Sequence, residues 1–171
     1  MKESSSIVQP ASERVSRTAT FRVDAEIERT FPLFGPISEM DWAPGWAPEI
    51  VYSVNPVVEE HMVFRTPGYH PSESHCLWAL TLFRPEEHLV EYTVSTQNRI
   101  WFIRVQCAAN GSSTNVEVTY TYTSLNELGC QLNRAAIAEM YRRDLRDWQE
   151  AIDYYLKTGK RWGCSPEFAG H

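Results

Sequence analysis

The last third of the chain has a helical pattern of apolar residues. From 124 to 158, apolar side chains recur every three or four positions, and charged side chains occupy positions between them. Ser124 and Glu127 have the spacing of a capping box, and Gly159 stands where a helix often ends in a left-handed residue. The pattern therefore predicts one continuous helix over 124–158. At a rise of about 1.5 Å per residue it would be about 50 Å long, so we expect it to lie across a sheet.

The chain before this helix alternates between apolar and polar positions, as strands with one buried face do. A first strand is predicted over 15–24. Two short helices follow it as far as Trp42, because Pro32, Gly35 and Pro36 interrupt one continuous helix. Further strands are predicted at 49–54, 62–66, 75–83, 89–95, 100–108 and 115–123. Strands that are grouped apart from the helices indicate an α+β domain with an antiparallel sheet.

Composition excludes some classes of function. The chain has 171 residues, a net charge of -6 and 43% hydrophobic residues, which is typical of one globular domain. An acidic chain lacks the basic surface expected of a nucleic-acid-binding protein. No apolar run is long enough for a membrane span, and the polar start carries no targeting signal. The four cysteines show no pairing pattern, which favours reduced thiols and a cytoplasmic location.

The sequence has no motif for a metal, nucleotide or nucleophilic site. HxxH, HExxH and CxxC do not occur, and neither do the glycine-rich phosphate-binding patterns or GxSxG. We therefore expect neither a metal ion nor another cofactor.

Four stretches resemble a known superfamily. The short helices and the segment after them read FPLFGPISEMDWAPGWAPEIV from Phe31 to Val51, later strands contain LWALTLFRPEEH and VEVTYTYTSL, and the long helix ends in YLKTG. Together they resemble the START-like, or SRPBCC, superfamily, which includes the birch-pollen allergens, polyketide cyclases and lipid-transfer domains. The resemblance covers nearly the whole chain, roughly 15–160.

This resemblance implies a helix-grip fold. A seven-stranded antiparallel sheet would curve around the long C-terminal helix, with two short helices after the first strand. The domain would span 15–160, between an N-terminal tail at 1–14 and a C-terminal tail at 161–171. A hydrophobic cavity would lie between the sheet and the helix, and function would follow from its ligand, because the fold alone does not choose one.

Aromatic residues are the first candidates for the cavity wall, because an apolar ligand is held by aromatic faces with a few hydroxyls. Each of them either lines a cavity or fills the core, and alternation leaves both possibilities open. The helix has small or flexible inward positions first, which predicts a cavity against its first half and solid core from Leu145 to Ile152. The candidate ligand-binding residues are Trp42, Trp46, Tyr52, Phe64, His75, Leu77, Tyr92, Trp101, Ile103, Tyr120, Tyr122, Leu132, Ala136 and Met140.

Few side chains are candidates for chemistry. His75 shares a strand face with Leu77 and would point into the pocket as an acid, base or hydrogen-bond donor; the alternative is an exposed or hydrogen-bonded histidine. An arginine that reaches into an apolar cavity would anchor a carboxylate or enolate oxygen. Arg104 is expected on the convex, wet face, whereas the directions of Arg65 and Arg99 at their strand ends stay open.

Three functions remain. The first is binding of a small hydrophobic or aromatic molecule, such as a lipid or a polyketide, without catalysis. The second is a cyclase- or aromatase-like enzyme, acting without metal or nucleotide, in which a pocket histidine or tyrosine moves protons. The third is a protein-binding module like the chaperone-activator branch of the superfamily. Exposed strand edges would also permit a homodimer.

Overall fold

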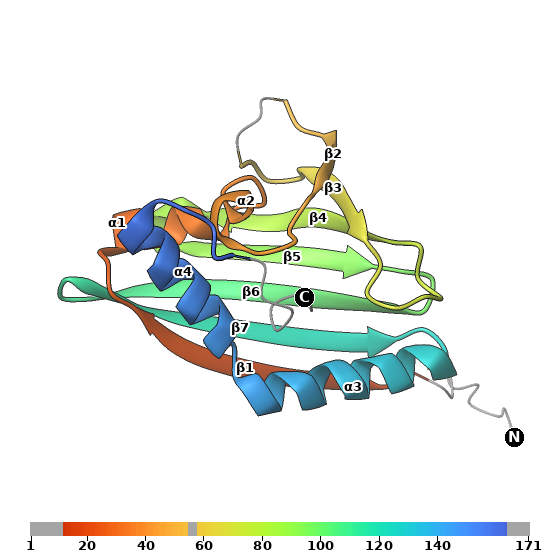
Figure 1. Ribbon diagram of the computed structural model, residues 1–171. Coiled ribbons are helices and arrows are strands. Elements are labelled where there is room, and N and C mark those ends of the chain that lie inside the picture. Colours follow the sequence, from red (N-terminus) through yellow and green to blue (C-terminus); the bar gives the residue numbers. More distant parts are fainter. Residues whose placement is uncertain (1–11, 55–57, 164–171) are drawn as a thin grey trace, which may run out of the picture.

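The computed structural model describes residues 12–54 and 58–163 (Figure 1). Residues 1–11, 55–57 and 164–171 lie outside the described part. Most of the two predicted tails, 1–14 and 161–171, therefore falls outside it, as does Cys164.

Within the described residues, seven strands form one antiparallel sheet, as predicted, and their order in the sheet is β1-β7-β6-β5-β4-β3-β2. They are β1 (Arg14–Val23), β2 (Glu49–Tyr52), β3 (Val63–Pro67), β4 (His75–Arg84), β5 (Leu89–Ser95), β6 (Arg99–Asn110) and β7 (Ser113–Ser124). From β2 to β7 each strand pairs with the next strand along the chain, and β1 pairs with β7. Strands β1 and β2 are therefore the two edges of the sheet.

Alternation along the central strands gives the sheet one apolar and one polar face. Trp101 and Ile103 of β6 and Val118 of β7 are buried, as predicted. On the opposite face Arg104 is exposed, and its guanidinium lies 3.7 Å from a carboxylate oxygen of Glu91. The apolar face meets the helices, so the core and any cavity must lie on that side.

Short helices follow β1, as predicted. They are α1 (Ile27–Thr30), the 3₁₀ turn η1 (Phe31–Phe34) and α2 (Glu39–Trp42), and a further 3₁₀ turn, η2 (Pro85–Glu87), joins β4 to β5. Two indole N–H groups hold the helical segment and its following loop together: Trp42 donates to the Leu33 carbonyl over 2.8 Å, and Trp46 to the Pro36 carbonyl over 2.7 Å. Trp46 also packs edge-on against Phe64 of β3 and Trp78 of β4.

The C-terminal helical segment is present, but it is divided in two. Helix α3 (Glu127–Arg143) and helix α4 (Arg146–Thr158) are separated by Asp144 and Leu145. Both linking residues have left-handed backbones, with φ of 53° and 56°. The expectation of one continuous helix over 124–158 is therefore wrong at this point. Neither glycine nor proline marks the break in the sequence, which is why the apolar pattern did not reveal it.

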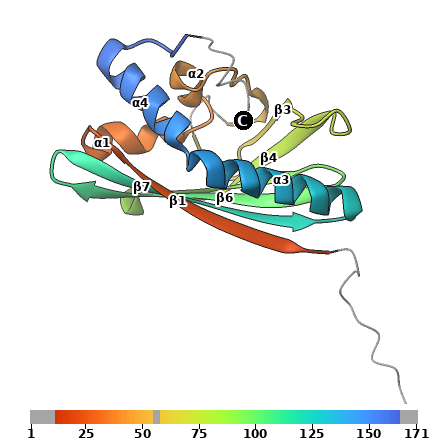
Figure 2. The same ribbon diagram turned by 60° about the horizontal axis from the view of Figure 1, so that its bottom comes forward.

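The break lets the two helices cover different parts of the apolar face. Helix α3 contacts β7, β1 and β6, whereas α4 contacts β1 and α2. Figures 1 and 2 show both helices on the same side of the sheet, with α4 leaving α3 at an angle. The predicted helix end at Gly159 is confirmed, with φ of 67°. No described helix has an apolar stretch long enough to cross a membrane.

The start of α3 is fixed by a close approach to the turn between β5 and β6. The N-cap is Asn126, whose side-chain oxygen accepts a hydrogen bond from the Gly129 N–H over 2.9 Å. The predicted capping box of Ser124 and Glu127 is therefore not the cap that forms. A Cβ on Gly129 would lie 2.0 Å from the Asn98 carbonyl oxygen, so only glycine allows this contact.

Candidate ligand-binding cavity

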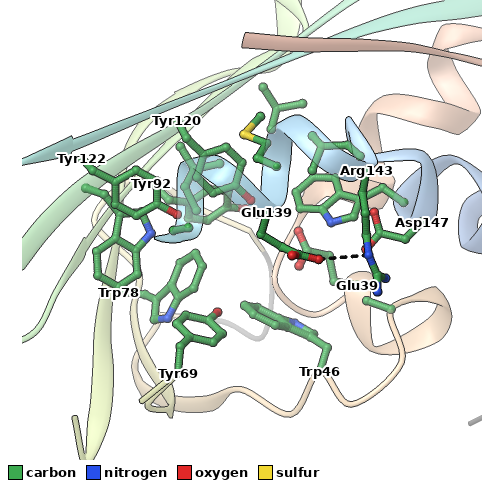
Figure 3. A pocket seen from close by; sticks show the side chains of 18 of the residues that line it. Glu39, Trp46, Tyr69, Trp78, Tyr92, Tyr120, Tyr122, Glu139, Arg143 and Asp147 are labelled. Carbon is green, nitrogen blue, oxygen red and sulfur yellow. Dashed lines mark ion pairs between the residues drawn. The ribbon is translucent and has the colours of Figure 1, made fainter. Parts of the chain in front are cut away.

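A cavity of about 370 Å³ lies between the sheet and the helices (Figure 3). The sheet contributes one wall, α2 and its following loop a second, and the residues on both sides of the helix break a third. The lining residues are Glu39, Trp42, Ala43, Trp46, Tyr69, Trp78, Tyr92, Arg99, Trp101, Ile103, Val105, Tyr120, Tyr122, Ala136, Glu139, Met140, Arg143, Leu145, Asp147 and Trp148.

Nine of the fourteen candidate ligand-binding residues line this cavity: Trp42, Trp46, Tyr92, Trp101, Ile103, Tyr120, Tyr122, Ala136 and Met140. The sheet members of this set lie on strands whose alternation is regular, so their inward direction could be predicted. Their contact with a ligand stays a prediction.

Two other candidates lie on the wrong face of β4. His75 and Leu77 are exposed, whereas Cys76 and Trp78 between and after them are buried. The expectation that His75 points into the pocket is therefore wrong, and its ring nitrogen lies 3.0 Å from the hydroxyl of Ser74 instead. Both faces of β4 carry apolar residues, so alternation could not tell which face is inside.

Three more candidates also lie outside the cavity wall. Tyr52 is 63% exposed because β2 is an edge strand with all four residues exposed. Phe64 is fully buried, and its ring stacks on Trp78 at a centroid distance of 5.3 Å, so it belongs to the core behind the wall. Leu132 is half-buried on α3, one turn before the lining begins at Ala136.

The cavity faces the middle of the C-terminal segment, where solid core was expected. Leu145 and Trp148 line it, and only Ile152 of the expected core positions is fully buried. Ala136 and Met140 of the first half also line the cavity, but the expectation of solid core at Leu145 and Trp148 is wrong because the break at 144–145 turns the backbone around this space. The sequence did not point to the lining residues Glu39, Ala43, Tyr69, Trp78, Val105, Glu139, Arg143 and Asp147, and it left the direction of Arg99 open.

Four members of the aromatic wall present mainly apolar faces to the cavity, because their polar atoms already have partners. The Trp78 indole donates to the Thr66 hydroxyl over 2.9 Å, and the Tyr92 hydroxyl donates to the Phe34 carbonyl over 2.7 Å. The indoles of Trp42 and Trp46 are bonded to backbone carbonyls, as described above. A ligand in the cavity would therefore meet these rings without having to replace a hydrogen bond.

Two tyrosines differ from the others. The hydroxyls of Tyr120 and Tyr122 have no hydrogen-bond partner among the residues that the structure describes, and their rings stack at 5.9 Å. Burial raises the pKa of both hydroxyls well above the ordinary value. At neutral pH they are therefore protonated and able to donate to a ligand. Figure 3 shows these tyrosines and Tyr92 extending from the sheet, with Tyr69 opposite them.

A buried ion pair lies at one end of the cavity. Arg99 binds Glu73 through two hydrogen bonds, of 3.0 Å from Nε and 2.8 Å from Nη2, and the two side chains are 5% and 0% exposed. Burial by itself raises the pKa of Glu73, but hydrogen bonds from Arg99 and from the Thr96 hydroxyl outweigh it, so the pKa is lowered. The direction of Arg99, which sequence left open, is therefore inward.

Acidic groups from three helices line the cavity at α2 and the helix break. Glu139 pairs with Arg143 over 3.0 Å, shown as the dashed line in Figure 3, and Asp147 follows from α4. Glu39 of α2 is half-buried, and removal from water raises the pKa of its carboxyl to about 8. A carboxyl group with such a pKa can give or take a proton near neutral pH. In the described part of the chain, no three His, Cys, Asp or Glu side chains cluster as metal ligands would.

Comparison with known proteins gives matches only among solved structures. No protein-family model and no curated protein matches the chain. Norcoclaurine synthase from Thalictrum flavum, solved with dopamine and hydroxybenzaldehyde, matches with a TM-score of 0.63 and 13% identity over 88% of this chain and 90% of that one.

Two further structures have the same arrangement. The Zhui aromatase/cyclase from a Streptomyces species has a TM-score of 0.67 and 12% identity over 86% of this chain and 98% of that one. Ara h 8.0201 has a TM-score of 0.62 and 13% identity over 85% and 99%. These likenesses establish the architecture: the chain has the helix-grip fold that these three structures share.

Proposed function

We propose that the protein binds a small, largely apolar aromatic molecule in the cavity between the sheet and the C-terminal helices. The observation that carries this proposal is the aromatic wall, in which the polar groups of Trp42, Trp46, Trp78 and Tyr92 are already hydrogen-bonded within the protein. The cavity volume of about 370 Å³ is within the range typical of small-molecule sites. The dopamine and hydroxybenzaldehyde bound to norcoclaurine synthase are aromatic molecules of this size class, in a protein of the same fold.

Replacing either of two neighbouring alanines on α3 with phenylalanine tests this proposal. Ala136 lines the cavity, whereas its neighbour Ala135 is exposed. We expect Ala136→Phe to fill the cavity and to remove the thermal stabilisation that naphthalene and related aromatic molecules give the wild type. Ala135→Phe adds the same side chain outside the cavity and should keep that stabilisation. Ligand at a hundredfold excess over Kd stabilises the fold by about 2.7 kcal/mol, so differential scanning fluorimetry would resolve the difference.

The binding test begins with native mass spectrometry of the freshly purified protein, which would reveal a co-purified aromatic molecule. Retained stabilisation in the Ala136→Phe variant would place binding elsewhere and contradict the proposal. Failure of the wild type to bind any aromatic, sterol or fatty-acid probe would also contradict it.

A second candidate function is a cyclase-like enzyme, and Glu39 is the observation that favours it. Its carboxyl group lies in the cavity wall with a pKa of about 8, where it can act as a general acid or base. The test is intramolecular aldol condensation of a synthetic poly-β-ketone, in which a carbon–carbon bond forms and water leaves. If the enzyme proposal holds, Glu39→Gln should slow turnover by about 100-fold or more and leave naphthalene binding unchanged. Equal turnover in the variant would remove Glu39 from the chemistry.

A further inference from the structure

Arg99 keeps one nitrogen available although it is buried in an ion pair. Its Nε and Nη2 atoms are bonded to Glu73, and Nη1 has no hydrogen-bond partner among the described residues. In the described chain, the polar side-chain atoms that are both fully enclosed and unpaired belong to Arg17, Asn98 and Asn133. Nη1 of Arg99 is not among them, so it is not fully enclosed. Arg99 is also one of the residues that line the cavity.

Tyr122 provides a second donor on the same cavity wall. The Arg99 guanidinium carbon lies 6.0 Å from the Tyr122 ring and 4.9 Å from the Trp101 ring, and all three residues line the cavity. The Tyr122 hydroxyl has no hydrogen-bond partner in the described part of the protein and is protonated at neutral pH, as described above. This end of the cavity therefore offers hydrogen-bond donors over an aromatic surface.

The charge at this end distinguishes between classes of acceptor. Glu73 already neutralises Arg99 in a buried, bidentate pair, and both Glu73 oxygens are occupied by Arg99 and Thr96. A ligand carboxylate would place a second buried anion beside one guanidinium, and the loss of its hydration would be only partly offset. An uncharged carbonyl accepts the same hydrogen bonds without adding charge.

We propose that the Arg99 end of the cavity is a subsite for an uncharged acceptor oxygen, the ketone or ester carbonyl of an aromatic ligand, bound by Arg99 Nη1 and the Tyr122 hydroxyl. This inference rests on the proposed function. An arginine by itself suggests a carboxylate or enolate as the ligand group. The expected ligand group is instead an uncharged oxygen, because Glu73 is part of the subsite.

Binding of two shape-matched probes tests the subsite. The probes are 2-acetylnaphthalene, which carries a ketone, and 2-isopropenylnaphthalene, which carries a methylene group in its place. We expect Tyr122→Phe to weaken binding of the ketone by about five- to tenfold and binding of the hydrocarbon by less than about twofold. Tyr92→Phe is the matched control, because the Tyr92 hydroxyl is bonded to the Phe34 carbonyl and the ratio of the two Kd values should not change.

The countercharge is tested with 2-naphthoate. The wild type should bind the ketone more tightly than this anion, and Glu73→Gln should raise affinity for the anion relative to the ketone by about tenfold or more, since Arg99 then lacks a carboxylate. Calorimetry on each variant, with its thermal unfolding recorded first, gives the ratios.

The outcomes separate the subsite from the proposed function. If the hydrocarbon binds but Tyr122→Phe weakens both probes equally, the cavity binds aromatic ligands and the subsite is wrong. A wild type that prefers 2-naphthoate to the ketone would likewise overturn the subsite. If neither naphthalene derivative binds the wild type, the proposed function fails and the subsite fails with it.

Discussion

Glu39 is a carboxyl group within a largely aromatic enclosure, and its ionisation costs free energy in the folded protein. Burial raises its pKa to about 8, from an ordinary value of 4.5. Its negative charge in turn contributes to the raised pKa values of Tyr69, Tyr92 and Tyr120, so these hydroxyls lie within its electrostatic reach. The neutral, protonated form of Glu39 is therefore the one that the fold favours at neutral pH.

This cost gives Glu39 a defined effect on stability. Between pH 4.5 and 8 the folded protein keeps the proton that the unfolded chain releases, so the stability present at low pH is lost as pH rises through the folded pKa. Glu39→Gln does not titrate, and we expect it to raise the unfolding free energy above the wild-type value by about 1–3 kcal/mol at pH 8. Near pH 4 the two proteins should be equally stable.

Urea unfolding at both pH values measures this difference, with Glu28→Gln at an exposed position as the control. A difference between Glu39→Gln and wild type that is the same at pH 4 and pH 8 would show that Glu39 titrates normally in the folded protein.

At the scale of elements, the break between α3 and α4 shapes the cavity. Asp144 and Leu145 both adopt left-handed backbones, which are costly for residues other than glycine. Arg17 of the edge strand β1 reaches Asp144 over 2.8 Å and lies 3.6 Å above the ring of Tyr141, so the break is attached to the sheet. Leu145 lines the cavity and is only 8% exposed, so the burial of its side chain offsets the cost of its left-handed backbone.

Two substitutions at Asp144 separate the backbone from the ion pair. Both Asp144→Ala and Asp144→Gly remove the carboxylate that Arg17 binds, but only glycine adopts the left-handed backbone without steric cost. We expect the alanine variant to be less stable than the glycine variant by about 1 kcal/mol in chemical denaturation. Equal stability of the two variants would mean that the left-handed link is not required by the packed helices.

At the scale of the whole molecule, the sequence predicted the layers better than the site. Regular alternation in β1, β6 and β7 gave both the strands and the buried face, and it gave Trp101 and Tyr122 as inward residues. It failed in β4, where Leu77 and Trp78 are both apolar and only packing decides which one is buried. A local pattern predicts an element when the element has one clearly polar face.

The polar residues of the cavity could not be predicted for a different reason. Glu39 and Asp147 are more than a hundred positions apart in the chain, and they meet at one cavity only because α4 packs against α2. Arg99 could be noticed, but its partner Glu73 lies in a loop with no regular pattern. Such constellations depend on tertiary packing, and one sequence carries no local signal for them.

The distribution of tryptophan has an optical consequence. The chain contains six tryptophans, and five of them, Trp42, Trp46, Trp78, Trp101 and Trp148, line the cavity. Most of the tryptophan absorption and emission of the native protein therefore originates from the wall of the site. The molecule carries its own spectroscopic label, at the place where a ligand would exclude water from the indole rings.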